Sequence, residues 1–209
     1  MLTLAPRSFP DLIHCDTMSP ASLESHLRLY EGYVHKFNQM AQQLAALLAN
    51  GPANFTLDTE SLKTDMTFAL SAIKNHELYF DNLSQPLPGE TDQPTGALAE
   101  AIVKSFHSVP QYLVDLKQTA NQGRGWAWTA YDLDHDYLVN YGSGTLNAIP
   151  VWNCVPILAI DLYGHAYFYD YGNNRLAYIE SLMQGLNWEK ISQKYLAAKK
   201  LAVQRLATV

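Results

Sequence analysis

The sequence predicts an α+β protein with an N-terminal antiparallel helical hairpin and a C-terminal α/β lobe holding a small antiparallel sheet of about three strands, surrounded by helices. Two long amphipathic segments follow each other, and each carries one histidine on its apolar stripe. Aromatic alternation and short apolar runs follow in the second half. We expect an N-terminal domain over residues 1–90 and a C-terminal domain over residues 91–209, linked through the Pro- and Gly-rich stretch 85–96.

The first helix is expected from Ser19 to about Asn50. Ser19 suits the N-cap, Pro20 suits the first helical position, and Asn50-Gly51-Pro52 provides a stop. Side chains recur at steps of three and four along one seam, as on a packed helix, and His26 belongs to it. The seam comprises Leu23, His26, Tyr30, Tyr33, Phe37, Met40, Leu44 and Leu47.

The second helix is expected from about Asp58 to Leu83, and its seam contains His76. Because a short turn joins two matched seams, the helices should pack antiparallel, so that His26 and His76 face each other. A buried imidazole needs partners for its ring nitrogens, which leaves two interpretations open: a shared metal ion or a hydrogen-bonded core pair. The second seam comprises Leu62, Met66, Ala69, Ile73, His76, Phe80 and Leu83.

The second half predicts helices first and strands afterwards. Residues 97–120 read as one or two helices broken near Val109-Pro110. Residues 125–131 and 137–140 are expected to be strands. The acidic stretch 132–136 between them is typical of a solvated hairpin turn rather than a metal loop.

A third strand should end next to two further candidate ligands. Residues 156–160 form a short apolar run that ends on Asp161, and His165 follows four residues later, before a helical tail from about Asn174. A side chain at a strand end stays anchored by the sheet, so Asp161 and His165 can converge on one point. With His26 and His76 they form a set of three imidazoles and one carboxylate, which suits iron, manganese or zinc better than magnesium or calcium.

The composition indicates an ordinary globular protein. The chain has 209 residues, 48% of them hydrophobic, and a net charge of −6, with no basic run longer than one pair, so we expect no nucleic-acid partner. No apolar stretch reaches the roughly 18 residues that cross a bilayer, so we expect no membrane segment. The N-terminus lacks signal-peptide features, which predicts a cytoplasmic protein. We expect Cys15 and Cys154 to be reduced structural thiols.

Five motifs along the chain carry a resemblance to a known family. They are SPASLESH at 19–26, NHELYF at 75–80, GRGWAW at 123–128, DLYGHAYFYDYGNNR at 161–175 and Asn187-Trp188-Glu189. Through them the sequence resembles the iron/manganese superoxide dismutases over nearly its whole length. The resemblance implies one iron or manganese ion per subunit, with a water or hydroxide as fifth ligand, and superoxide anion as the substrate that is converted to dioxygen and hydrogen peroxide. It implies four protein ligands: His26, His76, Asp161 and His165.

The resemblance also implies roles around these ligands. Tyr33 would be the gateway tyrosine, and Trp126 and Trp128 would line the metal pocket. Tyr163 stands where the family often has tryptophan, and Arg175 would add positive charge on the substrate's route.

One irregularity concerns the first-helix ligand. The spacing from His26 to Tyr33 is one residue shorter than the commoner family pattern, so an ungapped match would put Ser25 at the ligand position. Ser25 falls off the seam and cannot replace imidazole as a ligand, which favours His26.

The residue that would tune the metal-bound solvent also differs. The family places a glutamine at one of two positions, which here read Ala72 and approximately Ala148. Asn147 and Asn153 are the alternative candidate donors. The resemblance therefore leaves two functions open: an active dismutase, and a metal-binding protein of the same fold with weak or no dismutase activity.

The family's usual bridge between subunits is altered as well. Gly164 stands where the family usually has glutamate, and Phe168 where it usually has tyrosine. We expect a homodimer, if one forms, to have a weakened or different interface.

Overall fold

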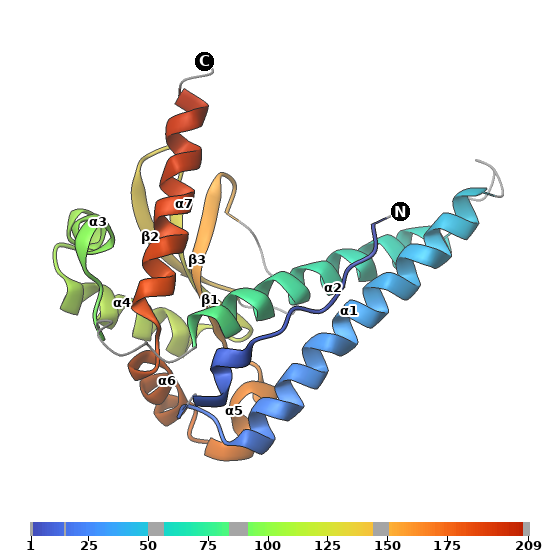
Figure 1. Cartoon of the computed structure of the whole chain (residues 1–209), viewed down its shortest axis with the longest axis horizontal. Helices are drawn as coiled ribbons and strands as arrows, with labels where there is room; N and C mark the ends of the chain where they lie inside the picture. Colours follow the sequence, from blue (N-terminus) through green and yellow to red (C-terminus); the bar gives the residue numbers. More distant parts are fainter. Residues whose placement is uncertain (1, 15, 50–56, 84–91, 144–150, 207–209) are drawn as a thin grey trace.

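The computed structural model describes residues 2–14, 16–49, 57–83, 92–143 and 151–206. In this part of the chain seven α-helices and one 3-10 helix, Pro10–His14, accompany a single three-stranded sheet, which confirms the predicted α+β class. Two long helices project together from one side of the molecule, and the last helix extends along the sheet in a different direction (Figure 1). Within the described ranges, no helix has the length and apolar character to span a membrane.

The predicted hairpin is formed by α1, Pro20–Ala49, and α2, Leu57–Asn82, which lie side by side in Figure 1. Ser19 begins α1, since its Oγ accepts a hydrogen bond from the backbone N–H of Ser22 at 3.2 Å. Most residues of the two predicted seams are buried, including both histidines. Those that are only partly buried are Tyr33, Met40, Leu47, Leu62 and Met66. The seams therefore bring the inward histidines of both helices into the body of the protein.

Two shorter helices, α3, Gly96–Phe106, and α4, Val109–Gln122, follow. The break lies at His107, whose φ of 69° is left-handed, and at Ser108, whose Oγ accepts from the backbone N–H of Gln111 at 3.2 Å. The predicted break is therefore confirmed, although Pro110 belongs to the first turn of α4, where it needs no N–H partner.

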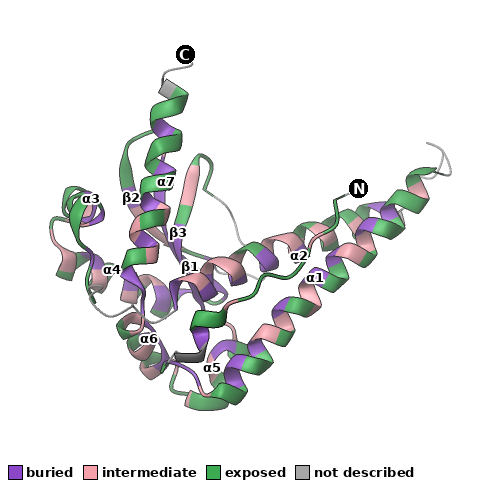
Figure 2. Ribbon diagram, viewed as in Figure 1, coloured by how far each residue is buried: buried purple, intermediate pink, exposed green. Residues whose placement is uncertain are grey.

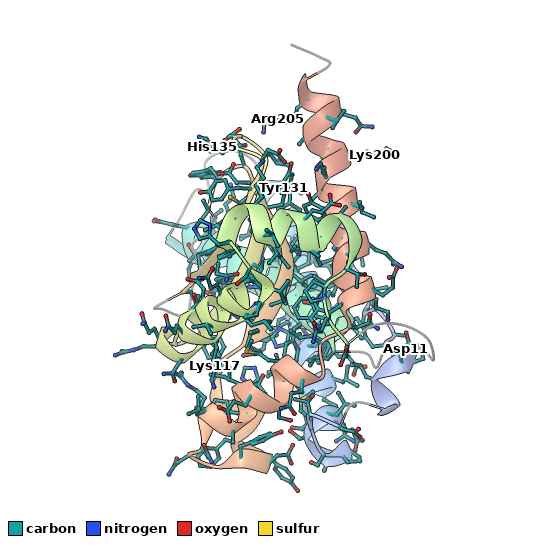
Figure 3. The ribbon with its side chains drawn as sticks, turned by 90° about the vertical axis from the view of Figure 1, so that its left-hand side faces the viewer. Asp11, Lys117, Tyr131, His135, Lys200 and Arg205 are labelled. Atoms are coloured by element: carbon teal, nitrogen blue, oxygen red, sulfur yellow. The ribbon has the colours of Figure 1, made fainter. Side chains whose placement is uncertain are left out.

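The sheet has the order β2-β1-β3, with both pairs antiparallel. Its strands are β1, Trp126–Asp132; β2, Tyr137–Gly142; and β3, Cys154–Asp161. The register pairs Trp126 with Asp161, which brings an indole beside the end of β3. His135, in the turn between β1 and β2, lies at the outer edge of the molecule (Figure 3), as expected for a solvated turn. Cys154 is a free thiol, and Cys15 lies outside the described residues.

Three helices complete the chain: α5, Gly164–Tyr171; α6, Arg175–Gln184; and α7, Trp188–Leu206. The helical tail is confirmed, and α5 is an additional helix that the sequence pattern did not indicate. Its outer side is exposed (Figure 2), with Phe168 at 59% and Tyr169 at 74% of full exposure. Ala166 is the fully buried residue of α5, and the partly buried rings of Tyr167 and Tyr171 pack against Tyr178 of α6, so this helix is held against its neighbouring helices.

Candidate metal centre

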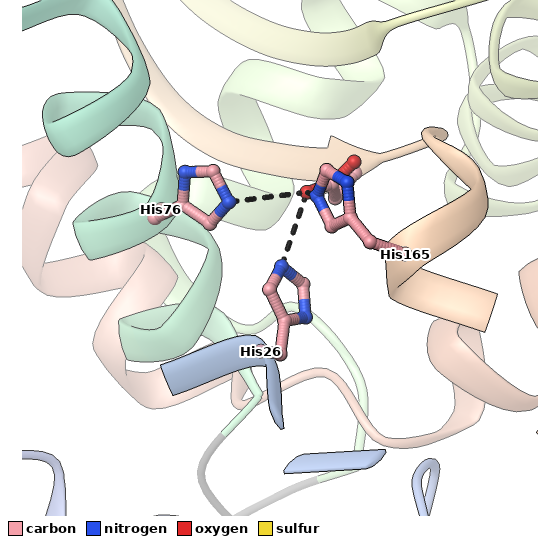
Figure 4. A group of neighbouring side chains, drawn as sticks. His26, His76 and His165 are labelled. Carbon is pink, nitrogen blue, oxygen red and sulfur yellow. Dashed lines mark hydrogen bonds and ion pairs between the residues drawn. The ribbon is translucent and has the colours of Figure 1, made fainter. Parts of the chain in front are cut away.

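Four polar side chains from four elements meet at one point (Figure 4), three of them buried and the fourth, His165, exposed. His26 comes from α1, His76 from α2, Asp161 from the end of β3, and His165 from the first turn of α5. One potential ligand atom from each residue lies within 4.8 Å of the other three. The hairpin and the sheet therefore assemble a cluster from residues that are up to 139 positions apart in the sequence.

Asp161 lies at the centre of the cluster. Its Oδ2 is 3.0 Å from Nε2 of His165 and 3.2 Å from Nε2 of His26, while Nε2 of His76 lies at 3.5 Å. Asp161 is completely buried and both helical histidines are at most 2% exposed. All three imidazoles thus direct the same ring nitrogen at one carboxylate oxygen.

Neighbouring groups hold Asp161 and His76 in these orientations. The backbone N–H of Tyr163 donates to Oδ1 of Asp161 at 2.9 Å, and the Tyr178 hydroxyl donates to its backbone carbonyl at 2.8 Å. His76 Nδ1 pairs with the carbonyl of Ala72 at 2.7 Å, which makes Nδ1 the protonated nitrogen and leaves the Nε2 lone pair free. Oδ2 of Asp161 and Nε2 of His76 are therefore available as ligand atoms.

Electrostatics favour neutral imidazoles beside an ionised carboxylate. Burial lowers the pKa of His76 from 6.5 to about 4, and burial also lowers the pKa of His26. Burial alone would raise the pKa of Asp161, but hydrogen bonds from His165 and His26 hold that pKa well below its ordinary value. At neutral pH His26 and His76 are therefore neutral and Asp161 is ionised, as a metal ion requires of such ligands.

The residues fit a single transition-metal ion. Among the described residues Nε2 of His76 is buried without a hydrogen-bond partner, although it points at the carboxylate. A cation among the four donors would give that nitrogen its partner and offset the negative charge of Asp161. Three imidazoles and one carboxylate define a mononuclear centre of the kind that iron, manganese or zinc occupies.

The structure distinguishes the two candidate positions on the first helix. His26 lies in the cluster, and its ring centroid is 5.1 Å from that of His76 and 5.0 Å from that of His165. Ser25 is exposed. Although the spacing to Tyr33 is one residue shorter than in the commoner family pattern, His26 and not Ser25 therefore lies on the inward face of the helix.

A cavity of about 130 Å³ adjoins the cluster. His76 and His165 form part of its wall, so a small molecule inside it would lie against two candidate ligands. Tyr33 contributes from α1, with its ring 5.6 Å from that of His76. The described lining residues are Tyr33, Phe68, Ser71, Ala72, Asn75, His76, Trp126, Tyr163 and His165.

Aromatic rings support the imidazoles from the cavity side. The Trp126 ring meets that of His76 edge to face at 5.2 Å, and the Tyr163 ring stacks on His165 at 5.6 Å with an interplanar angle of 10°. Ser71 and Asn75 also line the cavity, and neither was singled out from the sequence. Asn75 belongs to the NHELYF motif, so its position next to His76 was the available signal.

Two of the predicted surrounding residues lie outside the described lining of this cavity. Trp128 stacks behind Trp126 at 6.4 Å, and its indole N–H donates to Oδ1 of Asn75 at 3.2 Å. Arg175 donates to the carbonyls of Gly123, at 2.9 Å, and Asn121, where α4 ends. Trp128 thus supports the lining through Asn75, whereas Arg175 is engaged with backbone acceptors.

The two candidate asparagine donors have different outcomes. Asn147 lies outside the described residues, as does Ala148. Asn153 donates its amide N–H to Oδ2 of Asp134 at 2.8 Å, beside the turn that joins β1 and β2. Asn153 is therefore engaged at the opposite end of β3 from Asp161.

Comparison with known proteins identifies the family of this chain. A model of iron/manganese superoxide dismutases, C-terminal domain, matches residues 94–194. The Fe superoxide dismutase of Aquifex pyrophilus is 30% identical, over 94% of this chain and 93% of the relative. The Fe superoxide dismutase of Aquifex aeolicus is 31% identical, over 88% and 86%, and the Mn superoxide dismutase 1 of Halobacterium salinarum is 28% identical, over 79% and 80%. The chain belongs to the iron/manganese superoxide dismutase family.

Proposed function

We propose that this protein is a superoxide dismutase that works with one iron or manganese ion per subunit, held by His26, His76, Asp161 and His165. The observation that carries the proposal is the convergence of three Nε2 atoms on Asp161 Oδ2 beside a cavity. The relatives include both Fe and Mn enzymes, so their names leave the choice of metal to experiment.

The bound metal would supply a one-electron redox couple. One superoxide anion loses an electron and leaves as dioxygen, and a second gains an electron and two protons and leaves as hydrogen peroxide. The protein must therefore bind a small anion, keep bulk water away and deliver protons. The 130 Å³ cavity next to His76 and His165 is of a size for a diatomic anion and a few waters.

Tyr33 is the proposed proton donor on the cavity wall. Burial raises the pKa of Tyr33, and the negative charge of Asp161 raises it further, so the hydroxyl stays protonated at neutral pH. Trp126 and Tyr163 provide the apolar wall that excludes water from the imidazoles. Because the net charge of the chain is −6, attraction of superoxide must come from local groups, among which we place Arg175.

We also propose that any homodimer uses an altered interface. A Cβ built at Gly164 meets no described atom within 4 Å, so packing within the subunit does not require glycine there. Phe168 exposes 59% of its surface on the same helix and cannot donate the hydrogen bond of a tyrosine.

We propose in addition a cytoplasmic location and an antioxidant role. We also propose two domains, the hairpin domain over 1–90 and the α/β domain over 91–209.

Activity after loading with single metals tests the proposal. Metal-free protein is loaded separately with iron, manganese and zinc, and superoxide decay is followed after pulse radiolysis at matched metal content. We expect protein loaded with iron, manganese or both to accelerate superoxide decay more than the same metal ion free in solution does. Zinc-loaded protein should not accelerate the decay, because zinc has no one-electron couple. Binding of all three metals without accelerated decay would instead identify a metal-binding protein of the same fold.

A further inference from the structure

Two buried polar atoms on α1 have no hydrogen-bond partner among the described residues. They are Oγ of Ser22 and Nδ1 of His26. Both residues are only 1% exposed, so bulk water does not replace the missing partners. A buried donor or acceptor left unpaired costs about 1–3 kcal/mol, so two such atoms on one helix face require a physical account.

The surroundings of the His26 ring leave little choice of acceptor for Nδ1. The ring is enclosed by other rings, with centroid distances of 5.1 Å to Phe80 and 5.2 Å to Tyr79. Phe80 has no acceptor atom, and the Tyr79 hydroxyl is engaged with the Tyr178 hydroxyl and with the sulfur of Met18. The preceding turn of the same helix, in contrast, carries a second atom without a partner among the described residues, Oγ of Ser22.

Ser22 lies on that turn, four residues before His26. Side chains at i and i+4 are neighbours on a helix face, and a helical side chain points back toward the N-terminus, so the His26 ring extends toward Ser22. His76 on α2 already uses this spacing, since its Nδ1 pairs with the carbonyl of Ala72, also four residues earlier. A change between staggered χ1 rotamers moves Ser22 Oγ across the helix face without moving the backbone.

We propose that Ser22 is a positioning residue whose hydroxyl oxygen accepts a hydrogen bond from Nδ1–H of His26 when the metal is bound. This bond satisfies both orphaned atoms at once. It holds the proton on Nδ1 and leaves the lone pair of Nε2 for the metal beside Asp161. The inference rests on the proposed ligand role of His26 and adds a residue that no motif comparison singled out.

Three variants test this inference. Ser22→Ala removes the acceptor, Ser22→Thr keeps a hydroxyl, and Ser25→Ala removes an exposed hydroxyl adjacent to His26 on the same helix. Loss of a group that supports a metal-bound histidine costs roughly 10- to 100-fold in metal affinity. We expect a loss of that size in chelator competition for Ser22→Ala, substantial recovery in Ser22→Thr, and wild-type affinity for Ser25→Ala.

Two further measurements exclude a purely structural effect. Ser22→Ala removes an unpaired buried hydroxyl, so metal-free Ser22→Ala should melt at or above the wild-type temperature while the loaded form loses its metal faster. In zinc-loaded protein, which is diamagnetic, NMR should show a slowly exchanging His26 Nδ1–H in the wild type that is lost or exchanges rapidly in Ser22→Ala.

The inference is overturned if Ser22→Ala retains metal within twofold of Ser25→Ala, or if the wild type shows no protected His26 Nδ1–H. Either result leaves the proposed dismutase function standing, provided that the loaded wild type is active. Conversely, a wild type that holds metal with a Ser22-dependent affinity but does not accelerate superoxide decay would contradict the proposed function alone.

Discussion

Replacing Asp161 by asparagine changes the centre of the cluster while keeping its shape. The backbone N–H of Tyr163 donates to Oδ1 at 2.9 Å, so the side-chain carbonyl of asparagine must take the Oδ1 position. The amide NH2 then occupies the place of Oδ2, facing the Nε2 atoms of His26 and His165. A donor group replaces the anionic ligand atom, and an amide nitrogen with its hydrogens directed inward cannot bind a cation.

The expected loss of metal affinity follows from this exchange of an anionic ligand atom for a hydrogen-bond donor. Loss of a group that merely supports a ligand costs roughly 10- to 100-fold in metal affinity, so loss of the anionic ligand itself should cost at least about 100-fold, or about 3 kcal/mol. The metal-free variant should stay folded with a similar melting temperature, because the amide can donate to the imidazoles that previously paired with the carboxylate.

The assay is metal content per subunit after loading with iron or manganese and dialysis against a chelator, together with calorimetric melting of the metal-free protein. Asp115→Asn is the matched control, since Asp115 is an exposed carboxylate that accepts from Nδ2 of Asn140 at 2.9 Å. Asp161→Asn protein that keeps one iron or manganese per subunit, like the control, would refute the assignment of Asp161 as a ligand.

Three further predictions concern pH, support and assembly. In the metal-free protein the pKa of His76 is lowered from 6.5 to about 4, so the unfolded state binds more protons than the folded state between these pH values. The free energy of unfolding should therefore fall by roughly 3 kcal/mol as the pH falls from 6.5 to 4. A urea midpoint that stays constant or rises on acidification would contradict this. Tyr178→Phe leaves the carbonyl of Asp161 without its donor and should cost about 1–3 kcal/mol in thermal unfolding, whereas exposed Tyr169→Phe should cost nothing measurable; equal effects would argue against the bond. Gly164→Glu should leave folding stability unchanged, because the added Cβ meets no described atom within 4 Å. It should strengthen dimerisation in sedimentation velocity runs. An unchanged association constant would contradict the idea that the missing glutamate weakens the interface between subunits.

The helical hairpin could be predicted from the sequence because helix periodicity shows directly which side chains share a face. Steps of three and four placed His26 and His76 on matched seams, and the structure brings their rings to 5.1 Å. The same seam selected His26 over Ser25, which is exposed. The strand end at Asp161 was equally visible, since a short apolar run ended there.

Other features depend on contacts that no local pattern contains. Aromatic side chains occupy both sides of helix α5, with Tyr167 and Tyr171 packed against the core and Phe168 and Tyr169 exposed, so its sequence shows no contrast between an apolar and a polar face that would predict a helix. The cavity combines α1, α2, β1 and the residues after β3, which is why Ser71 and Asn75 were missed. Arg175 is engaged by carbonyls at the end of α4, a contact between segments more than fifty residues apart.

The central claim is that His26, His76, Asp161 and His165 together hold one iron or manganese ion. Anomalous diffraction from crystals of the loaded protein, recorded on both sides of the iron and manganese absorption edges, tests it most directly. We predict one anomalous peak per subunit, within coordination distance of Nε2 of the three histidines and of Oδ2 of Asp161. A peak elsewhere in the subunit, or one that leaves any of the four side chains uncoordinated, would contradict the claim.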